Sequence, residues 1–393
     1  MTGTVLAQLA LPVLVYASTG SALLSALAFA TSFLPYLAAG VLLSALVDRV
    51  PTRRLLVGCN VVSALVALGM AAPGAPIAVL LLLACLLGLT GPVFQGGRAA
   101  TLRAALPGAA FVPGRSLIRL VAQGSQIGGF ALSGLLLTVV PPRTLMVCNA
   151  VSFAIAAVIL RVGTRERPPK ASRAGQGAGG SVARDSLSGI RQVFAIPPIR
   201  RLLIFMWAFP AIAIAPEALA VPYAHGLPGG SALQAGLMLT AIPAGTFAGE
   251  TLVTWRASPD QQVRLIRASV VVLFLPLVAF AARPGIVVAI ALLAVAGLGF
   301  AALPGLDRAV LAEAPEDLLA RTLSIQSAGL MFFAGVGYAV AGAAAEFLRP
   351  AYVIALAGGA GIALVLTLAP RASATSQDSD SAAASAPAET TAS

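Results

Sequence analysis

The chain has few charged residues, one histidine, one lysine and three cysteines among its 393 residues. Only 10% of its residues are charged, whereas soluble domains carry about 25%, so most of the surface is expected to face lipid. The histidine, His225, lies in a predicted loop, the cysteines are not spaced as pairs, and no HExxH or GxSxG pattern occurs. These absences argue against a disulfide framework, a metal site and a membrane enzyme, so no catalytic residue, metal or cofactor is predicted.

The single lysine, Lys170, stands between Pro169 and Ala171, so the Gly-Lys-Ser/Thr sequence of a phosphate-binding P-loop is absent. The net charge of +11 comes from basic residues in short loops, without the aromatic-laced basic face that follows a nucleic-acid backbone. The sequence therefore predicts neither an ATPase nor a nucleic-acid-binding protein. Any pumping would have to use an ion gradient or a partner.

Long apolar runs dominate the sequence, which is 59% hydrophobic. A membrane-spanning helix needs about 20 apolar residues, and hydropathy predicts twelve spans in an all-α membrane protein. The first run, Val5–Tyr16, is short for a bilayer, so helix 1 is expected to be short or truncated, with the true start upstream. The other predicted spans are Ser21–Val47, Leu55–Ala71, Pro76–Phe94, Leu117–Val139, Thr144–Leu160, Leu202–Tyr223, Ala232–Trp255, Ala268–Ala282, Ile286–Leu303, Thr322–Ala344 and Ala351–Leu368.

Two polar segments divide the chain. The stretch from Arg161 to Ile199 is rich in Gly, Ser and Arg and is predicted to be a flexible linker. The last residues are rich in Ala, Ser and Thr and are predicted to be a disordered tail. The expected organisation is a six-helix bundle in 1–162, a cytoplasmic linker in 163–199, a second six-helix bundle in 200–369 and a cytoplasmic tail in 370–393.

The basic residues sort to one side of these spans. With twelve spans, 22 of the 25 basic residues fall on one side, and only Arg143, Arg283 and Arg349 fall on the other. The positive-inside rule then places both termini and the linker in the cytoplasm. The excess of arginine over lysine, with many Ala and Gly residues, indicates a high-GC bacterial genome. The predicted location is therefore the inner or plasma membrane of a bacterium.

The second half of the chain repeats the first at a near-constant offset. The alternative explanation of this match is that apolar, Ala-rich segments resemble one another through their composition alone. Repeated six-helix halves are what secondary transporters use to alternate access to a site near the membrane midplane. The pairs are Arg54 with Arg264 and Arg98 with Arg308, both offset by 210, Pro35 with Pro243, offset by 208, and Arg115 with Arg321, offset by 206.

The segment SALVDRVPTRRLL resembles the cytoplasmic motif G-x-L-x-D-R-x-G-R-[KR]-[KR] of the major facilitator superfamily. Asp48, Arg49, Arg53 and Arg54 match it, while Ser44 replaces the first glycine and Pro-Thr replaces Gly-Arg. The resemblance extends from residue 10 to 368 and is similar to the bacterial multidrug and siderophore exporter branch. It implies a fold of two pseudo-symmetric six-helix bundles and a latch, made by these four residues, that closes the cytoplasmic side. The alternative is a basic loop that only sets topology.

Two further segments are similar to motifs of this superfamily. The second copy of the latch motif has Trp255 in place of Asp48, so a second latch would have to use Asp260. Helix 5 resembles the antiporter motif G-x-x-x-G-P-x-x-G-G, with Phe130 where proline is expected. Its small residues suit either close helix packing or gating. They are Gly124, Gly129, Ser133 and Gly134, and helix 11 carries the similar set Gly335, Gly337 and Gly342.

Ionisable residues inside spans are costly and therefore indicate function. Glu217 lies sixteen residues past Arg201, about 24 Å along helix 7, where three prolines are expected to break the helix. We expect Glu217 to couple proton or substrate movement, the alternative being a carboxylate that reaches the outer interface. Glu250 is a second candidate and could instead pair with a nearby arginine. Glu346 is expected to form an interfacial ion pair with Arg349.

Helix 5 also carries a polar stripe. Arg119 and Gln123 are four residues apart and share a face, and Gln126 follows by three. Such a stripe is expected to face a cavity, although Arg119 could lie in the cytoplasmic interface instead. Asn149 and Tyr223 are further candidate cavity residues.

Together these features predict a secondary active transporter, a monomer in the lipid bilayer, that exports an amphipathic small molecule by alternating access, driven by a proton or other ion gradient. Two alternatives remain. One is an importer of a small metabolite. The other is a degenerate, non-transporting facilitator that serves as a sensor or scaffold, as the short first helix and the altered second motif would allow.

Overall fold

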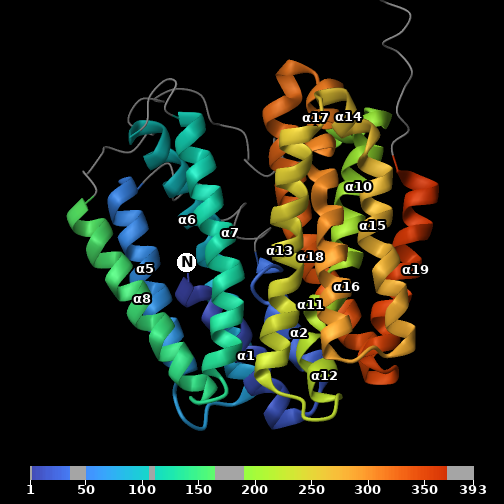
Figure 1. Cartoon of the computed structure of the whole chain (residues 1–393). Helices are drawn as coiled ribbons and strands as arrows, with labels where there is room; N and C mark the ends of the chain where they lie inside the picture. Colours follow the sequence, from blue (N-terminus) through green and yellow to red (C-terminus); the bar gives the residue numbers. More distant parts are fainter. Residues whose placement is uncertain (1, 36–49, 106–110, 164–189, 370–393) are drawn as a thin grey trace, which may run out of the picture.

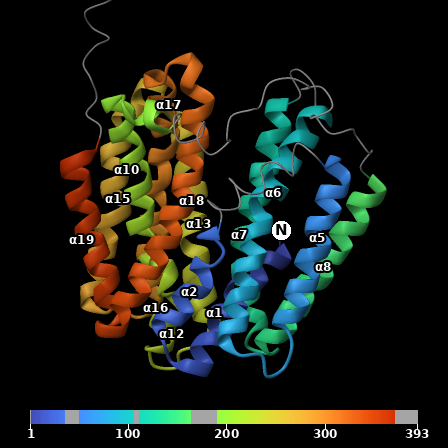
Figure 2. The same cartoon turned by 180° about the vertical axis from the view of Figure 1, so that it is seen from behind.

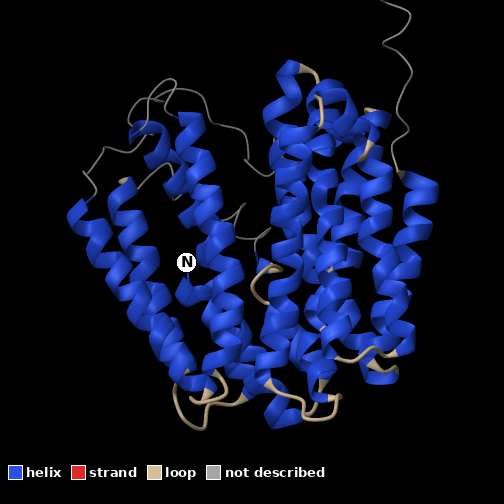
Figure 3. Ribbon diagram, viewed as in Figure 1, coloured by secondary structure: helices blue, strands red, loops and turns tan. Residues whose placement is uncertain are grey.

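The computed structural model describes residues 2–35, 50–105, 111–163 and 190–369. Over these ranges the regular structure is helical throughout (Figure 3). Seven helical segments in the described part are long and apolar enough to cross a membrane, and three further apolar helices are shorter. Together with α2 and α7 they fit the twelve expected spans. The protein is therefore a multi-pass, all-α membrane protein.

The helices before residue 164, blue to green in Figure 1, form one half of the molecule, and those after residue 189, light green to red, form the other. The N-terminal half consists of α1 (Thr2–Thr19), α2 (Ala22–Ala30), α5 (Thr52–Met70), α6 (Ile77–Ala105), α7 (Phe111–Leu136) and α8 (Pro142–Gly163). The C-terminal half consists of α10 (Pro197–Ala213), α11 (Ala215–Ala218), α12 (Ala220–His225), α13 (Ala232–Arg256), α14 (Pro259–Arg264), α15 (Ile266–Val278), η3 (Ala279–Ala282), α16 (Ile286–Leu298), η4 (Gly299–Ala301), α17 (Ala302–Glu313), α18 (Glu316–Phe347) and α19 (Pro350–Leu368).

The two ends of the bundle differ. We call the end where α8 ends and α10 begins the linker face, and the opposite end, where α12 ends and α13 begins, the far face. The ribbons of the two halves approach each other toward the far face and diverge toward the linker face (Figures 1 and 2). The contacts between the halves therefore lie toward the far face.

Several helices extend beyond the apolar runs from which they were predicted. Helix α1 covers eighteen residues, about 27 Å, rather than only Val5–Tyr16. Helix α6 continues to Ala105, past the predicted end at Phe94, and α18 begins at Glu316, before the predicted start at Thr322. Hydropathy finds the part of a helix that lies in lipid, whereas backbone hydrogen bonding continues into the polar interface. The predicted span Ser21–Val47 lies partly in residues 36–49, outside the described residues.

The seventh span is broken, as its prolines predict. It begins at α10, continues through the single turn α11 and ends in α12. The breaks fall at Ile214 and Leu219, beside Pro210, Pro216 and Pro222, and proline removes a helical hydrogen bond and clashes with the preceding turn. Glu217 lies in the turn between the two breaks.

The chain is ordered before the predicted end of the linker. Helix α10 begins at Pro197, where proline is favoured at the first helical positions, rather than after Ile199. Val193 and Ile199 are buried in a cluster with Leu203 and Trp207. These apolar side chains attach the start of α10 to its own half. The rest of the linker, 164–189, lies outside the described residues.

Burial is distributed as expected for a protein in lipid. The largest buried cluster includes Phe205, Phe209 and Phe274 in the C-terminal half and extends to α1 and α2 of the N-terminal half. Large apolar side chains also lie on the outside, for example Leu65 of α5 and Leu356 of α19, both more than half exposed. A soluble protein would rarely expose so much apolar surface, but a bilayer covers it.

Candidate functional site

Near the far face the two halves contact each other along two helix pairs, α7 with α13 and α2 with α18. In the first pair Gly134 lies against Gly236. A methyl group added to Gly236 would lie 2.7 Å from the Cα atom of Gly134, closer than side chains normally approach. The absence of side chains at both positions therefore allows the two backbones to touch.

The second pair, α2 and α18, is joined by aromatic rings. Tyr338 of α18 stacks on Phe29 of α2 and on Phe33 in the turn that follows α2, with ring centroids 5.3 and 5.4 Å apart. Tyr338 is fully buried. On the same helix, an added methyl group at Gly335 would lie 2.8 Å from Leu34 Cγ, and one at Gly342 would lie 2.6 Å from Ala26 Cβ. Rings and glycines together form a tightly packed contact between the halves.

Glu217 lies near this contact, in α11, which packs against both α18 and α2. The Tyr338 hydroxyl group is close enough to the Glu217 carboxylate to interact with it electrostatically, although it is buried without a partner in full hydrogen-bond geometry. Glu217 itself is partly buried, in the turn between the two breaks of the seventh span. The Tyr338 hydroxyl group therefore lies near a carboxylate of its own half, while its ring stacks on the other half.

At the rim of the far face, Glu346 joins α18 to the start of α2. Its carboxylate accepts hydrogen bonds from Ser21 Oγ, at 2.6 Å, and from the Leu23 backbone N–H, at 2.8 Å. The expected ion pair with Arg349 is wrong, because the carboxylate is occupied by the N-terminus of α2, where backbone N–H groups and the helix dipole favour an anion. The rim is completed by Tyr16 and His225, whose rings meet edge to face at 5.4 Å.

A cavity of about 210 Å³ lies beside the stacked rings. Its walls come mainly from the N-terminal half, and Met331 of α18 closes it from the other half. The lining is largely apolar, with Met70, Phe29 and Phe33 among it, and its polar side chains are Thr4, Gln8 and Ser32. A mostly apolar pocket with a few polar groups, located between two bundles, is where a small-molecule site is expected. Sequence reasoning had not selected these residues.

The predicted stripe on helix 5 is not brought to this cavity. Gln123 and Gln126 are partly buried on α7, and neither lines the cavity, while the side chain of Arg119 lies outside the described residues. The two further candidates, Tyr223 and Asn149, do not line this cavity either. Tyr223 donates a hydrogen bond to the Pro284 carbonyl at 2.7 Å, and the Asn149 amide is buried without a hydrogen-bond partner.

The small residues of helix 5 lie in different environments. An added methyl group at Gly129 would lie 2.8 Å from Val5 Cβ of α1, and the buried Ser133 hydroxyl donates to the Leu6 carbonyl at 3.0 Å. Gly134 contacts the other half, as described above. Gly124 has nothing within 4 Å of the position where a Cβ atom would stand. Three of the four positions therefore allow close helix approach, and Gly124 does not need to.

Arg53 and Arg54 of the predicted latch are in the first turn of α5, at the linker face, and Asp48 and Arg49 lie outside the described residues. In the second copy of the motif, Gln262 rather than Asp260 is hydrogen-bonded to an arginine. The buried Gln262 side chain accepts a hydrogen bond from Arg308 Nε at 2.8 Å, whereas Asp260 is exposed in the first turn of α14. Glu250 is partly buried on α13, six residues before Arg256.

Over the described ranges, no group of three or more His, Cys, Asp or Glu side chains is arranged to hold a metal ion. The sequence model of the Major Facilitator Superfamily matches residues 1–309. The chain belongs to this superfamily. As a member of this transporter family it is expected to move a solute across the membrane.

Solved structures of other facilitators share its fold. A variant of the nucleoside transporter NupG is 16% identical, with a TM-score of 0.73 over 94% of this chain and 99% of that chain. A D-xylose–proton symporter is 13% identical, with a TM-score of 0.68 over 95% and 97% of the two chains. A search of curated protein sequences returns no significant match. At these identities the likeness describes the fold of this facilitator and not its substrate.

Proposed function

We propose that the protein exports an amphipathic small molecule by alternating access, driven by proton entry. The observation that carries the proposal is the arrangement at the far face, where a membrane carboxylate, Glu217, adjoins a residue that holds the two halves together. An ionisable group in that position can link its own protonation to the opening of one side of a transporter.

The orientation of the protein decides which side of the membrane this conformation opens to. We infer from the arginine distribution that the linker face is cytoplasmic and the far face is outside. The contacts described between the halves lie near the far face, so this conformation would receive its solute from the cytoplasm. We further propose that the latch of Asp48, Arg49, Arg53 and Arg54 forms in the alternate state, when the linker face closes.

Glu217 is the proposed coupling residue. A charged carboxylate in the membrane needs donors or water, whereas its protonated form does not. Deprotonation of Glu217 would favour an arrangement in which the Tyr338 hydroxyl group donates a hydrogen bond to its carboxylate. Protonated Glu217 would no longer need this donor. Because the ring of Tyr338 packs between the halves, a change in its hydroxyl partner would alter the far-face contact. Glu250 is the alternative coupling carboxylate, and Arg119, Gln123 and Gln126 remain candidates for solute contact in other states.

The cavity supports an amphipathic solute. Its volume suits a small organic molecule or part of a larger one, and its walls offer rings and methionines with only three polar side chains. Methionine is flexible and polarizable, so Met70 and Met331 could adapt to solutes of different shape. A strongly polar metabolite would leave most of its hydrogen-bonding groups unpaired there.

Reconstitution tests the proposal. The full-length protein is placed in liposomes with a fluorescent, permanently charged amphipathic cation as solute, and a pH gradient is imposed in each direction, with protein-free liposomes as the control. Movement of this cation against its own gradient, opposite to the proton flow and only where the protein is present, is the expected result. Movement in the direction of proton flow would identify an importer. No movement of any member of a solute panel, although the protein is inserted, would favour a sensor or scaffold.

A further inference from the structure

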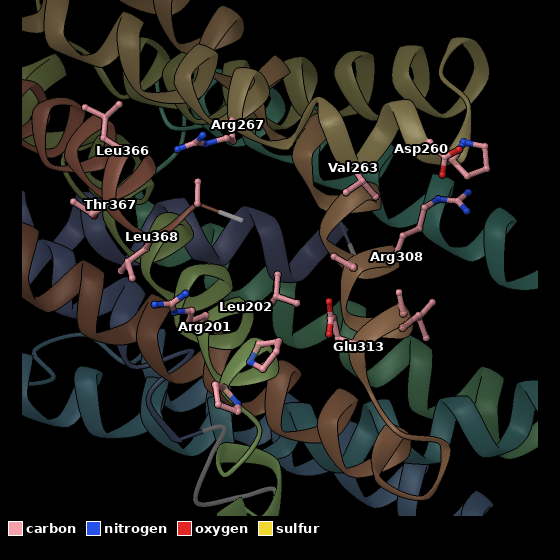
Figure 4. A pocket seen from close by; sticks show the side chains of 17 residues that line it. Arg201, Leu202, Asp260, Val263, Arg267, Arg308, Glu313, Leu366, Thr367 and Leu368 are labelled. Atoms are coloured by element: carbon pink, nitrogen blue, oxygen red, sulfur yellow. The ribbon is translucent and has the colours of Figure 1, made fainter. Parts of the chain in front are cut away.

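A groove of about 1060 Å³ opens at the linker face of the C-terminal half (Figure 4). It is bounded by the first turn of α10, by α14 and the start of α15, by the last turns of α17 and by the end of α19. It is separate from the cavity beside Tyr338 and shares no lining residue with it.

Three arginines from three different helices line the groove: Arg201 of α10, Arg267 of α15 and Arg308 of α17. They lie around the same opening in Figure 4. Sequence separations of 66 and 41 residues show that the grouping is made by the fold and not by one basic loop. Arginine at the end of a span can bind a phosphate or carboxylate with several donors at once.

Among the described residues, these arginines are not held in direct ion pairs. Asp260 and Glu313 also line the groove, but among the described residues neither forms an ion pair with any of its arginines. Arg308 donates its Nε hydrogen to the neutral side chain of Gln262. Arg267 has a buried Nε atom with no hydrogen-bond partner. A buried donor without a partner is costly, so the site is incomplete without an acceptor from outside the chain.

The other side of the groove is apolar. Leu311 of α17 and Leu366 and Leu368 of α19 line it. Leu366 is 68% exposed, on a helix whose outer surface carries further exposed leucines such as Leu356. The groove therefore joins a charged end to the surface that faces the acyl chains. A ligand that matches both parts has an anionic head and an apolar tail.

We propose that this groove binds the phosphate headgroup of an anionic phospholipid. All three arginines lie near the ends of spanning helices, at the depth where lipid phosphates occur, and basic pockets between spanning helices bind such headgroups. The phosphate oxygens would supply the acceptor that Arg267 lacks, and the acyl chains would lie along α19. The bound lipid would hold α10, α15, α17 and α19 together at this face. This assignment does not depend on the coupling role of Glu217.

The test measures lipid binding to the full-length protein by native mass spectrometry, with phosphatidylglycerol titrated into neutral detergent. Arg201→Gln combined with Arg267→Gln is expected to weaken binding of the tightest lipid about 25-fold. This corresponds to about five-fold, or about 1 kcal/mol, for each basic residue near the headgroup. The matched control combines Arg256→Gln with Arg264→Gln, which removes two exposed arginines of the same face outside the groove. It is expected to bind as the native chain does.

Two further variants keep the test decisive if the double variant folds poorly. Arg201→Gln alone changes an exposed side chain and should weaken binding about five-fold, and Arg267→Lys, which keeps the charge, should retain most of it. Equal loss in the groove variant and in its control would overturn the proposal, since it would show diffuse attraction only. Glycerol phosphate competing at the concentration of the lipid would also overturn it, because a soluble phosphate would then suffice.

Discussion

Tyr338 stacks on Phe29 with their ring planes only 8° apart, and this pair joins the C-terminal half to the N-terminal half. The same tyrosine reaches Glu217 with its hydroxyl group. A single side chain thus combines a contact that stabilises the far face with a contact to a group that can change charge. The ring and the hydroxyl group can be removed separately, which makes their roles separable by experiment.

Removal of the ring should open the far face. Tyr338→Ala deletes the stacking with both Phe29 and Phe33, and aromatic pairs contribute about 0.5–1.5 kcal/mol each, so the closed far face should lose about 1–3 kcal/mol. Distances between spin labels at Thr138→Cys and Pro228→Cys, one on each half, report the change, with the native cysteines replaced by alanine. A longer distance in an increased fraction of molecules is expected.

Removal of the hydroxyl group alone should leave the far face closed. Tyr338→Phe keeps both stacked pairs, so its label distances should match those of the native chain at one pH. Their dependence on pH should be lost, because the partner of Glu217 is absent. If Tyr338→Phe opens the far face as much as Tyr338→Ala does, the hydroxyl group and not the ring holds the halves together.

Neutralisation of Glu217 should uncouple transport from protons. Glu217→Gln is expected to abolish uphill solute movement driven by a pH gradient while exchange of solute at equal pH continues, because the neutral side chain no longer exchanges a proton. Initial rates in liposomes measure both. Glu250→Gln provides the comparison between the two candidate carboxylates. Full retention of gradient-driven movement in Glu217→Gln, with loss in Glu250→Gln, would reassign coupling to Glu250.

A side chain at Gly134 should separate α7 from α13. An added Cβ atom would stand 3.0 Å from the Cα atom of Gly236 and 3.1 Å from the Ala232 carbonyl oxygen, so Gly134→Val should destabilise the closed far face by about 1–3 kcal/mol. The same label pair measures the shift. Gly124→Val is the matched control on the same helix, with open space at that position. If Gly124→Val opens the far face as much as Gly134→Val does, the opening would result from valine in α7 and not from a clash with α13.

Loss of the carboxylate at Glu346 should weaken the rim. Glu346→Ala removes the acceptor for Ser21 and for the Leu23 N–H group, and loss of a helix N-terminal acceptor costs about 1 kcal/mol. The ratio of closed to open molecules should fall about five-fold, as measured by the same labels. Arg349→Ala is predicted to have no effect on this equilibrium. If Arg349→Ala has an effect as large as that of Glu346→Ala, the result would support the Glu346–Arg349 ion pair that the sequence predicted.

Features that depend on local sequence were predicted well. The apolar runs predicted the helical spans, and the prolines around Glu217 predicted the break in the seventh span, because both effects act within one turn or one helix. The ends of α6 and α18 were predicted less well. Hydropathy records the solvent around a residue, and a helix does not end where its solvent changes.

Contacts between distant residues were missed for a different reason. Ser21 and Glu346 are separated by 325 residues, and nothing in either local sequence indicates that they meet. Arg349 was chosen as the partner of Glu346 because it is near in sequence and opposite in charge. Gln262 was missed because only carboxylates were considered as partners for an arginine in the second copy, whereas an amide oxygen can also accept the Arg308 hydrogen.

The far-face contact described here is made of rings, glycine backbones and one capping carboxylate. Such forces act over very short distances, and a gap of an ångström already removes much of the attraction. A contact of this kind has no intermediate strength: it is complete or it is lost. The passage between the two sides should therefore open as a switch and not by degrees, and dissolved salt, which weakens contacts between exposed charges, should leave its threshold almost unchanged.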